Sequence, residues 1–223
     1  MDPEIRLIGT GLSRRFGAKA ALDGVNLTLR QGDRIALFGA NGAGKTTLLR
    51  VLSGALKSTA GTLSVGSGSI ALLTHRTLLY DDLSALENLV FFARLHGIAE
   101  PEKRARAWLK DVDLADRADE PVRGFSRGMQ QRVAFARALI QDPSVLLLDE
   151  PAAGLDARSW ARIKEFLLSS SRPAAWIIAS HDVEEGLALS RRWMILDLGR
   201  VVAEGESGGA DADRARALVA GAA

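Results

Sequence analysis

The chain contains no cysteine, although it is 223 residues long and 47% hydrophobic. The absence of cysteine excludes a disulfide framework, a thiolate metal site and a thiol nucleophile, and it suits a reducing compartment. No apolar run approaches the ~18–20 residues that a membrane-spanning helix needs. The N-terminus, Met1-Asp2-Pro3-Glu4, is acidic, and it lacks an apolar segment of the length that a signal peptide needs. We therefore expect neither secretion nor direct membrane insertion.

The sequence also lacks a dominant charge. It has 29 basic and 27 acidic residues, which leaves a net charge of +2 despite a pI near 9.2. So small a net charge creates no strong field, and we predict that nucleic acid is not the main partner, although a local basic patch remains open. The length suits one large α/β domain, or one such domain that carries a small inserted lobe.

What the sequence does contain is a glycine-rich loop between a strand and a helix. A short apolar run at 35–38 precedes the loop, and residues 47–52 have helical spacing after it. The spacing G-x4-G-K-T suits a nucleoside triphosphate, because glycines allow backbone N–H groups to close around phosphate oxygens and the helix start adds the positive end of its dipole. The predicted phosphate-binding residues are Gly39, Ala40, Asn41, Gly42, Ala43, Gly44, Lys45, Thr46 and Thr47.

Two residues of this loop have further predicted roles. We expect Lys45 to reach the β- and γ-phosphates as a point charge and the Thr46 hydroxyl to hold Mg²⁺. The alternative is a glycine-rich turn before an ordinary helix, which the agreement of spacing, residue types and flanking pattern disfavours.

A second candidate feature is a pair of carboxylates at the end of an apolar strand. Residues 145–148 are all apolar, as in the buried strands of parallel sheets, and Asp149 and Glu150 follow directly. Asp149 can order the Mg²⁺ shell, and Glu150 can polarise the attacking water, a role commonly worth roughly 10²–10⁴ in rate. A surface acidic pair is the alternative, and the four preceding apolar residues argue against it.

Three single residues are candidates with open alternatives. Phe16 lies beside a glycine between strands predicted at 4–9 and 25–29, where it can stack on adenine or pack in the core. Ser126, with Gly128 two residues on, caps a predicted helix, which provides either an anion site or an ordinary N-cap. His181 follows a predicted buried strand at 176–180, where it can sense a γ-phosphate or serve a structural role.

The middle of the chain reads as mainly helical. Ser84 and Glu87 form a capping box, which predicts a helix from 85 to about 96, and Pro101 opens a second predicted helix at about 101–112. Two strands are predicted before this region, at about 62–65 and 69–74, and a closing hairpin is predicted at 193–203. We expect a helical lobe inserted into an α/β core, with crossover helices of a single sheet as the alternative.

Taken together, these motifs resemble the ATP-binding subunit of ABC transporters, over about residues 5–205. The matching segments follow the family's order and spacing: 39–46 for Walker A, 125–129 for the signature, 145–150 for Walker B with Glu150 at the catalytic glutamate, 153–156 for the D-loop, His181 for the switch histidine and Phe16 for the adenine-stacking aromatic. Their combination makes the resemblance specific.

The resemblance implies an α/β P-loop NTPase fold, in which a RecA-like core with an N-terminal antiparallel β subdomain carries an inserted α-helical lobe. The single domain 1–223 would comprise a catalytic core at 1–76 and 141–205, a helical signature lobe at 77–140 and a C-terminal tail at 206–223, in which we find no chemistry.

The resemblance also implies hydrolysis of ATP with Mg²⁺. Glu150, His181 and Lys45 would be catalytic, and Thr46 and Asp149 would hold the metal. A nucleotide-dependent homodimer would place Ser126 and Gly128 of one copy against the Walker A loop of the other. Separate transmembrane permease subunits would hold the protein as a peripheral subunit at the cytoplasmic face of the inner membrane.

The chain departs from the family pattern in two places that matter here. The usual signature L-S-G-G-Q is replaced by Phe125-Ser126-Arg127-Gly128-Met129, which keeps the serine and the glycine expected to touch the γ-phosphate. The position of the Q-loop glutamine is occupied by His75, and a neutral imidazole is a poorer Mg²⁺ ligand than an oxygen donor. The Mg²⁺ contact of this loop is therefore in doubt.

The amino-acid sequence of residues 74–97 and 126–132 is similar to that of the exporter ATPases, and most similar to that of the haem-exporter subunit of cytochrome c biogenesis. A drug, lipid or polysaccharide exporter ATPase is the next hypothesis. A DNA-maintenance ATPase would need long coiled-coil heptads before the signature, and a translation-factor ATPase would usually carry two cassettes. Neither feature is present in the sequence.

Overall fold

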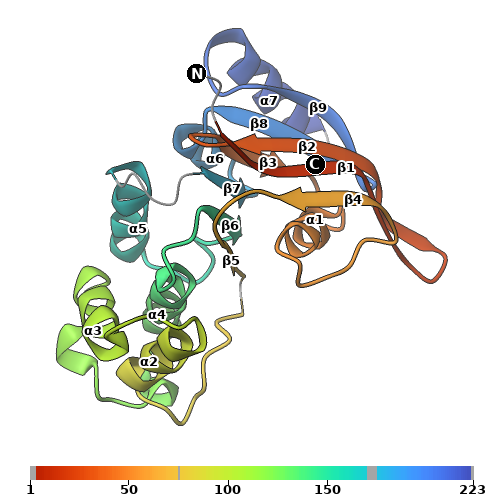
Figure 1. The fold of residues 1–223 in the computed structure, drawn as a ribbon. Helices are drawn as coiled ribbons and strands as arrows, with labels where there is room; N and C mark the ends of the chain where they lie inside the picture. Colours follow the sequence, from red (N-terminus) through yellow and green to blue (C-terminus); the bar gives the residue numbers. More distant parts are fainter. Residues whose placement is uncertain (1–3, 75, 170–174, 222–223) are drawn as a thin grey trace. The chain divides into compact units, whose positions relative to one another are not determined.

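The computed structural model describes residues 4–74, 76–169 and 175–221, which divide into two compact units. The first unit contains the described residues up to 72, residues 144–151 and residues from 175 onward (Figure 1). The second contains residues 73–143 and the described part of the chain from 152 to 169. We expected the helical lobe to end at 140, but the helix after residue 156 also groups with it.

The first unit is built from two sheets. A three-stranded antiparallel sheet has the order β2-β1-β4, and a six-stranded sheet has the order β5-β6-β7-β3-β8-β9. The strands are β1 (Ile5–Phe16), β2 (Lys19–Arg30), β3 (Arg34–Phe38), β4 (Ala60–Val65), β5 (Ile70–Leu73), β6 (Val145–Asp149), β7 (Ala175–Ala179), β8 (Arg192–Asp197) and β9 (Arg200–Glu206). The helices are α1 (Lys45–Leu52), α6 (Val183–Leu189) and α7 (Gly209–Gly221). The sequence predicted the central strands and the closing hairpin, and the structure confirms them.

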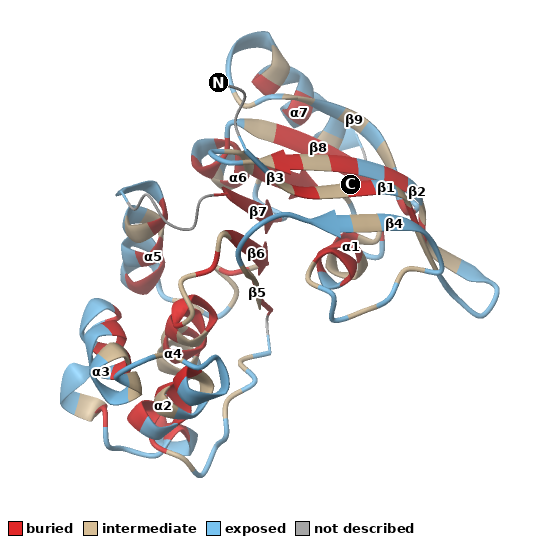
Figure 2. Ribbon diagram, in the orientation of Figure 1, coloured by how far each residue is buried: buried red, intermediate tan, exposed pale blue. Residues whose placement is uncertain are grey.

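The central strands of the larger sheet are parallel and their carboxyl ends are aligned. Ala179 of β7 pairs with Leu37 of β3 on one side and with Asp149 of β6 on the other. All five residues of β6 and all five of β7 are buried, as expected for apolar strands covered on both faces (Figure 2). The loops that follow these strands therefore leave the same edge of the sheet.

The first hairpin is longer than the sequence predicted. The expected strands at 4–9 and 25–29 extend to 12 residues each, and the hairpin closes with Phe16 opposite Lys19. The register between β1 and β2 shifts four times, including between Gly9 and Leu12. Each shift interrupts the alternation of apolar and polar residues, which is why the outer half of the hairpin does not read as strand in the sequence.

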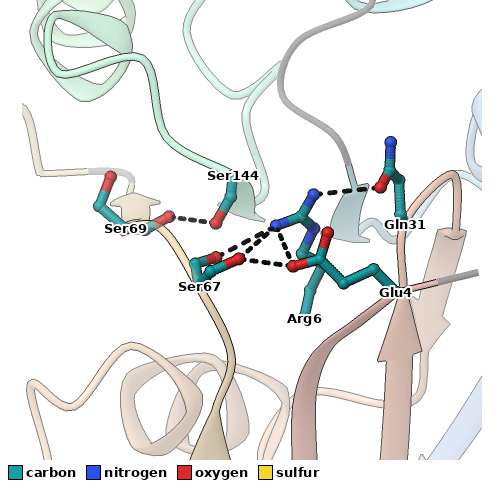
Figure 3. Close-up of polar contacts among 6 residues, drawn as sticks. All are labelled: Glu4, Arg6, Gln31, Ser67, Ser69 and Ser144. Atoms are coloured by element: carbon teal, nitrogen blue, oxygen red, sulfur yellow. Dashed lines mark hydrogen bonds and ion pairs between the residues drawn. The ribbon is translucent and has the colours of Figure 1, made fainter.

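Two groups of polar contacts hold the segment between β4 and β5 (Figure 3). The Arg6 guanidinium donates to Glu4 Oε1 at 3.0 Å, to the Ser67 hydroxyl at 3.0 Å and to Gln31 Oε1 at 3.1 Å. Close by, the Ser144 hydroxyl at the start of β6 donates to the Ser69 carbonyl at 3.0 Å. These contacts fix the connection between β4 and β5, which belong to different sheets.

The second unit is helical. It contains α2 (Ala85–Leu95), α3 (Pro101–Asp111), α4 (Arg127–Leu139) and α5 (Ala157–Ser169), with short 3₁₀ turns η1 (Ala115–Arg117) and η2 (Val122–Gly124). The capping box of α2 is confirmed, because Ser84 accepts from the Glu87 N–H and Glu87 accepts from the Ser84 N–H. Pro101 opens α3, as predicted.

Aromatic packing explains why α5 belongs to this unit. The Phe166 ring of α5 lies 5.3 Å from Trp108 of α3 and 5.8 Å from Phe135 of α4, in edge-to-face geometry. The apolar spacing of α5 alone does not reveal which unit it covers. In the described part of the chain, no helix combines the length and the apolar character needed to cross a bilayer.

Candidate nucleotide-binding site

The glycine loop is held in a conformation that only glycine permits at two positions. Gly39 and Gly44 have left-handed φ values of 144° and 111°. A Cβ at Gly39 would lie 2.2 Å from the Leu196 carbonyl oxygen, and one at Gly44 would lie 2.4 Å from the Ala21 carbonyl oxygen. The loop therefore packs directly on the backbone of β8 and β2, and its shape is fixed by the surrounding main chain.

Lys45 is the first residue of α1 and is only 7% exposed. Its ammonium donates to the Gly39 carbonyl at 2.6 Å and to the Ala40 carbonyl at 3.1 Å, so it lies across the loop. Burial lowers the pKa of Lys45, and the nearby charges of Glu150 and Asp149 partly oppose that shift. The lysine and both predicted carboxylates thus belong to one electrostatic neighbourhood.

The two carboxylates occupy the positions that the sequence predicted for them. Asp149 is the last residue of β6 and is 3% exposed. Glu150 is partly exposed, and its N–H donates to the Ala179 carbonyl at 3.0 Å. Glu150 has a φ of 50°, a left-handed value that costs a non-glycine residue free energy.

These residues fit a triphosphate and Mg²⁺. The loop gives a backbone cradle with a lysine across it, and Thr46 and Asp149 supply the oxygen donors that Mg²⁺ prefers. Among the described residues, no group of three or more His, Cys, Asp or Glu side chains could hold a metal ion. The Thr46 hydroxyl and the Asp149 carboxylate suit a cation that is held by one or two protein oxygens together with substrate phosphates.

His181 lies where the sequence placed it, directly beyond the end of β7. Its side chain is exposed, and its neighbour Asp182 caps α6 by accepting from the Glu185 N–H at 3.0 Å. The preceding Ser180 hydroxyl accepts from the Asp182 N–H at 3.0 Å, which fixes the turn around the histidine. Because β7 lies between β3 and β6, His181 leaves the same sheet edge as the phosphate loop and Glu150.

Phe16 is not a core residue. Its side chain is 50% exposed at the end of the first hairpin, and the Arg14 guanidinium lies 4.6 Å from the ring centroid. Core packing, one of the two alternatives, is therefore excluded. The candidate Q-loop residue His75 lies outside the described residues.

The signature residues belong to the second unit. Ser126 is the N-cap of α4 and accepts from the Met129 N–H at 3.3 Å, so the predicted cap is confirmed. A Cβ at Gly128 would lie 3.6 Å from both the Asp156 carboxylate and the Gly154 carbonyl oxygen. The start of α4 and the turn that precedes α5 are thus neighbours in this unit.

The unusual signature residues have structural partners. Phe125 is buried, with the Arg117 guanidinium 5.2 Å from its ring centroid. Arg127 lies against Gly154, where a Cβ would come within 2.6 Å of its Nε atom. Arg117 also donates to the Met129 sulfur at 3.3 Å. The three replacements are accommodated by packing around the helix start, and Ser126 remains exposed.

Sequence reasoning missed a contact made by the C-terminal tail. Arg216 of α7 donates to both carboxylate oxygens of Glu184 on α6, at 2.6 and 3.0 Å. This pairing lowers the pKa of Glu184 and raises that of Arg216. Since α6 begins two residues after His181, the tail is connected to the end of the sheet that carries the candidate site. Nothing in the spacing of 206–223 indicates this pair.

The phosphate loop, the aligned strand ends and the antiparallel β subdomain together define a P-loop NTPase. Residues 22–153 match the family model described as ABC transporter. The chain therefore belongs to the ABC transporter family.

Several known proteins are similar to this chain. It is 38% identical over 209 residues to the daunorubicin resistance ATP-binding protein DrrA3 of Streptomyces coeruleorubidus, with 87% of this chain and 66% of that protein covered. It is 36% identical to the Nod factor export ATP-binding protein I of Ralstonia nicotianae (88% and 65% covered). It is 38% identical to an aliphatic sulfonates import ATP-binding protein of Nocardia farcinica (86% and 78% covered).

The chain thus spans about two thirds of the length of the first two of these relatives. Its fold matches that of a dimeric ATP-binding cassette in a post-hydrolysis state bound to ADP and Pi, with a TM-score of 0.83, 26% identity, and 91% of this chain and 99% of that chain covered. It also matches an ATP-binding subunit of an ABC transporter with a TM-score of 0.86 and 25% identity, over 96% and 99% of the two chains.

Proposed function

We propose that this cassette powers transport of a substrate through separate membrane subunits, at the cytoplasmic face of the inner membrane. The observation that carries the proposal is the electrostatic neighbourhood of Lys45, Asp149 and Glu150 beside a glycine loop that the main chain holds in place. Such a site can bind a triphosphate, hold Mg²⁺ and position a water molecule. Bound Mg²⁺ would supply neutralisation of charge on the phosphates.

Each residue has a distinct proposed role in hydrolysis. Lys45 stabilises the charge that develops during phosphoryl transfer, and Thr46 with Asp149 holds the metal. Glu150, which directly follows the end of β6, accepts a hydrogen bond from the attacking water and polarises it. His181 contacts the γ-phosphate from the neighbouring strand end. Phe16 offers an exposed ring face to the adenine.

We propose that two copies close head to tail around two ATP molecules. The exposed N-cap Ser126 and Gly128 then contact the γ-phosphate bound to the Walker A loop of the partner copy, since a capped helix start attracts anions. The structural match to a dimeric cassette bound to ADP and Pi supports this arrangement. Hydrolysis would reopen the dimer.

A surface on the helical unit supports docking of a membrane subunit. Tyr80 is 50% exposed and Phe91 is 41% exposed, and the two rings lie 5.1 Å apart. Phe92 completes the group at 5.2 Å from Phe91. Aromatic side chains that remain exposed and in contact with one another are typical of protein interaction sites. We propose that the permease subunit binds here, close in sequence to His75.

The sequence of residues 74–97 resembles that of exporter ATPases and therefore favours export as the direction of transport. Haem export for cytochrome c biogenesis is one hypothesis. Export of a drug, lipid or polysaccharide is the second, and it is supported by relatives named for daunorubicin resistance and Nod factor export. In the complex with its membrane subunits, stimulation of ATP hydrolysis by haem supports the first hypothesis, whereas stimulation by daunorubicin supports the second.

The central experiment is the Glu150→Gln variant, followed by light scattering with and without Mg·ATP. We expect ATP turnover to fall roughly 10²-fold or more, because the variant cannot polarise the water, and we expect a monomer that dimerises when ATP is added. Glu102→Gln, at an exposed position of α3, is the matched control and should keep its turnover. Unchanged turnover in Glu150→Gln would refute the role of the glutamate.

A further inference from the structure

The helical unit contains a polar cavity that the candidate nucleotide site does not use. Its volume is about 280 Å³, and every side chain that lines it is polar. The lining residues come from the segment just after α3, the middle of α4 and the start of α5 with the residue before it: Asp113, Arg132, Asp156, Arg158, Ser159 and Arg162.

The charges around this cavity do not balance. Of its two carboxylates, Asp113 already pairs with the Arg162 guanidinium at 3.2 Å. Asp156 accepts from the Ser159 N–H and from the Ser159 hydroxyl, both at 2.8 Å, and so caps α5. Within the described part of the chain, the Arg158 guanidinium has no ion pair. Positive charge therefore exceeds negative charge at the cavity wall.

The Arg132 side chain is held in place by hydrogen bonds, but one of its N–H donors has no acceptor among the described residues. One terminal nitrogen donates to the Val112 carbonyl at 2.9 Å and to the Asp113 carbonyl at 3.2 Å, which holds the side chain at the end of α3. Its Nε atom is buried and has no hydrogen-bond partner among the described residues. A buried donor of this kind costs free energy unless a partner arrives.

The electrostatics support the same conclusion. Burial lowers the pKa of Arg132, and the like charges of Arg162 and Arg158 lower it further, while Asp113 and Asp156 oppose the shift. Three guanidinium groups thus repel one another around a space that is open to solvent. A bound anion would relieve this repulsion.

We propose that this cavity binds a phosphate-type oxyanion through the guanidinium groups of Arg132, Arg158 and Arg162. The planar guanidinium presents paired donors that match a phosphate group bidentately. A cavity of this size surrounds one tetrahedral group from several sides. A soluble phosphate compound and a lipid headgroup share this chemistry. The inference concerns binding only and does not rest on the proposed transport function.

The cavity lies beside the signature residue Gly128, so anion binding there would affect the surroundings of the signature. Asp156 lines the cavity, and one of its carboxylate oxygens also lies 3.6 Å from a Cβ built at Gly128, as close as the Gly154 carbonyl oxygen. An anion that pulls Arg158 and Arg162 inward would act on the first turn of α5, which Asp156 caps. The anion site and the start of α4 therefore share one residue.

The first test measures binding of inorganic phosphate by calorimetry at constant ionic strength. The full chain carries Lys45→Ala throughout, which removes the phosphate loop as a competing site. We expect binding in this protein, and affinity at least ~10-fold lower when Arg158→Gln is added, because one charge-assisted contact is lost. Since the Arg158 guanidinium has no ion pair in the described structure, this variant should fold normally. A melting temperature equal to that of the parent would establish that it does.

The control is Arg123→Gln, which removes another exposed arginine of the same unit, one that pairs with Asp82 at 2.7 Å. It should leave phosphate binding unchanged. Absence of phosphate binding in the Lys45→Ala protein would overturn the proposal, and so would equal affinity with and without Arg158→Gln.

A second measurement distinguishes the two sources of phosphate. The protein is floated with phosphatidylcholine vesicles that contain or lack phosphatidic acid. Flotation that requires phosphatidic acid and is lost in Arg158→Gln would support the site with a lipid headgroup as its ligand. Binding of free phosphate without flotation would support the site with a soluble phosphate compound as its ligand.

Discussion

The phosphate loop and the signature helix bind the same proposed ligand, but they are built differently. The loop is shaped by main-chain contacts, with Gly39 and Gly44 pressed against carbonyl groups of neighbouring strands. The start of α4 is shaped by side chains, with Ser126 as the cap and Phe125 and Arg127 packed around it. A site made by the backbone tolerates little change, whereas a site made by side chains can be rebuilt with other residues. This difference explains how an unusual signature can accompany an ordinary Walker A loop.

The largest effect is expected from Gly44→Ala. The new methyl group would lie 2.4 Å from the Ala21 carbonyl oxygen, so the loop must move, and we expect ATP affinity to fall more than ~100-fold. Gly42→Ala is the matched control, because it has the same left-handed backbone but open space around it. The Gly42→Ala variant should lose roughly 1–2 kcal/mol of unfolding free energy. Its loss of ATP affinity should be much smaller than that of Gly44→Ala. Equal losses of affinity in both variants would show that the close approach at Gly44 is unimportant.

A middle-sized effect is expected from Ser126→Ala, with Ser84→Ala as its control. Both serines are N-caps in the helical unit, so each variant should lose about 1 kcal/mol of unfolding free energy, measured by denaturant titration. Only Ser126→Ala should lower ATP turnover, by roughly 10²-fold, if its hydroxyl also contacts phosphate in the closed dimer. Turnover that falls equally in both variants would assign the effect to helix stability.

The smallest effect is expected from Arg127→Gly, which restores the residue usual at this signature position. The arginine packs on Gly154 and leaves the cap at Ser126 intact, so turnover should change by no more than about twofold. Steady-state phosphate release is the measurement. A tenfold change in either direction would mean that the signature is not rebuilt by packing alone, and the contrast between the two regions would weaken.

The sequence predicted the central strands and the glycine loop of the first unit well, because each of these features is local. The apolar strands at 35–38, 145–148 and 176–180, the glycine loop between the first of these strands and α1, and the closing hairpin are read from neighbouring residues, and the structure confirms all of them. The capping box at Ser84 was predicted for the same reason. Aligned strand ends then bring Lys45 and Glu150 together without further information.

What the sequence did not predict depends on contacts between distant segments. The bulges between β1 and β2 hide the outer half of the first hairpin, so the strand that ends at Phe16 was read as too short. The grouping of α5 with the helical unit depends on Phe166 meeting two aromatic rings from other helices. The cavity lined by Arg158 is likewise assembled from three helices, and no spacing in the sequence marks it.

The pairing of Arg216 with Glu184 connects the C-terminal helix to α6. Ala212 and Ala215 of α7 are buried, and Arg216 donates hydrogen bonds to both carboxylate oxygens of Glu184 on α6. Glu184 is the second residue of α6, which begins two residues after His181. The contact therefore joins the C-terminal helix to the segment that follows the end of β7.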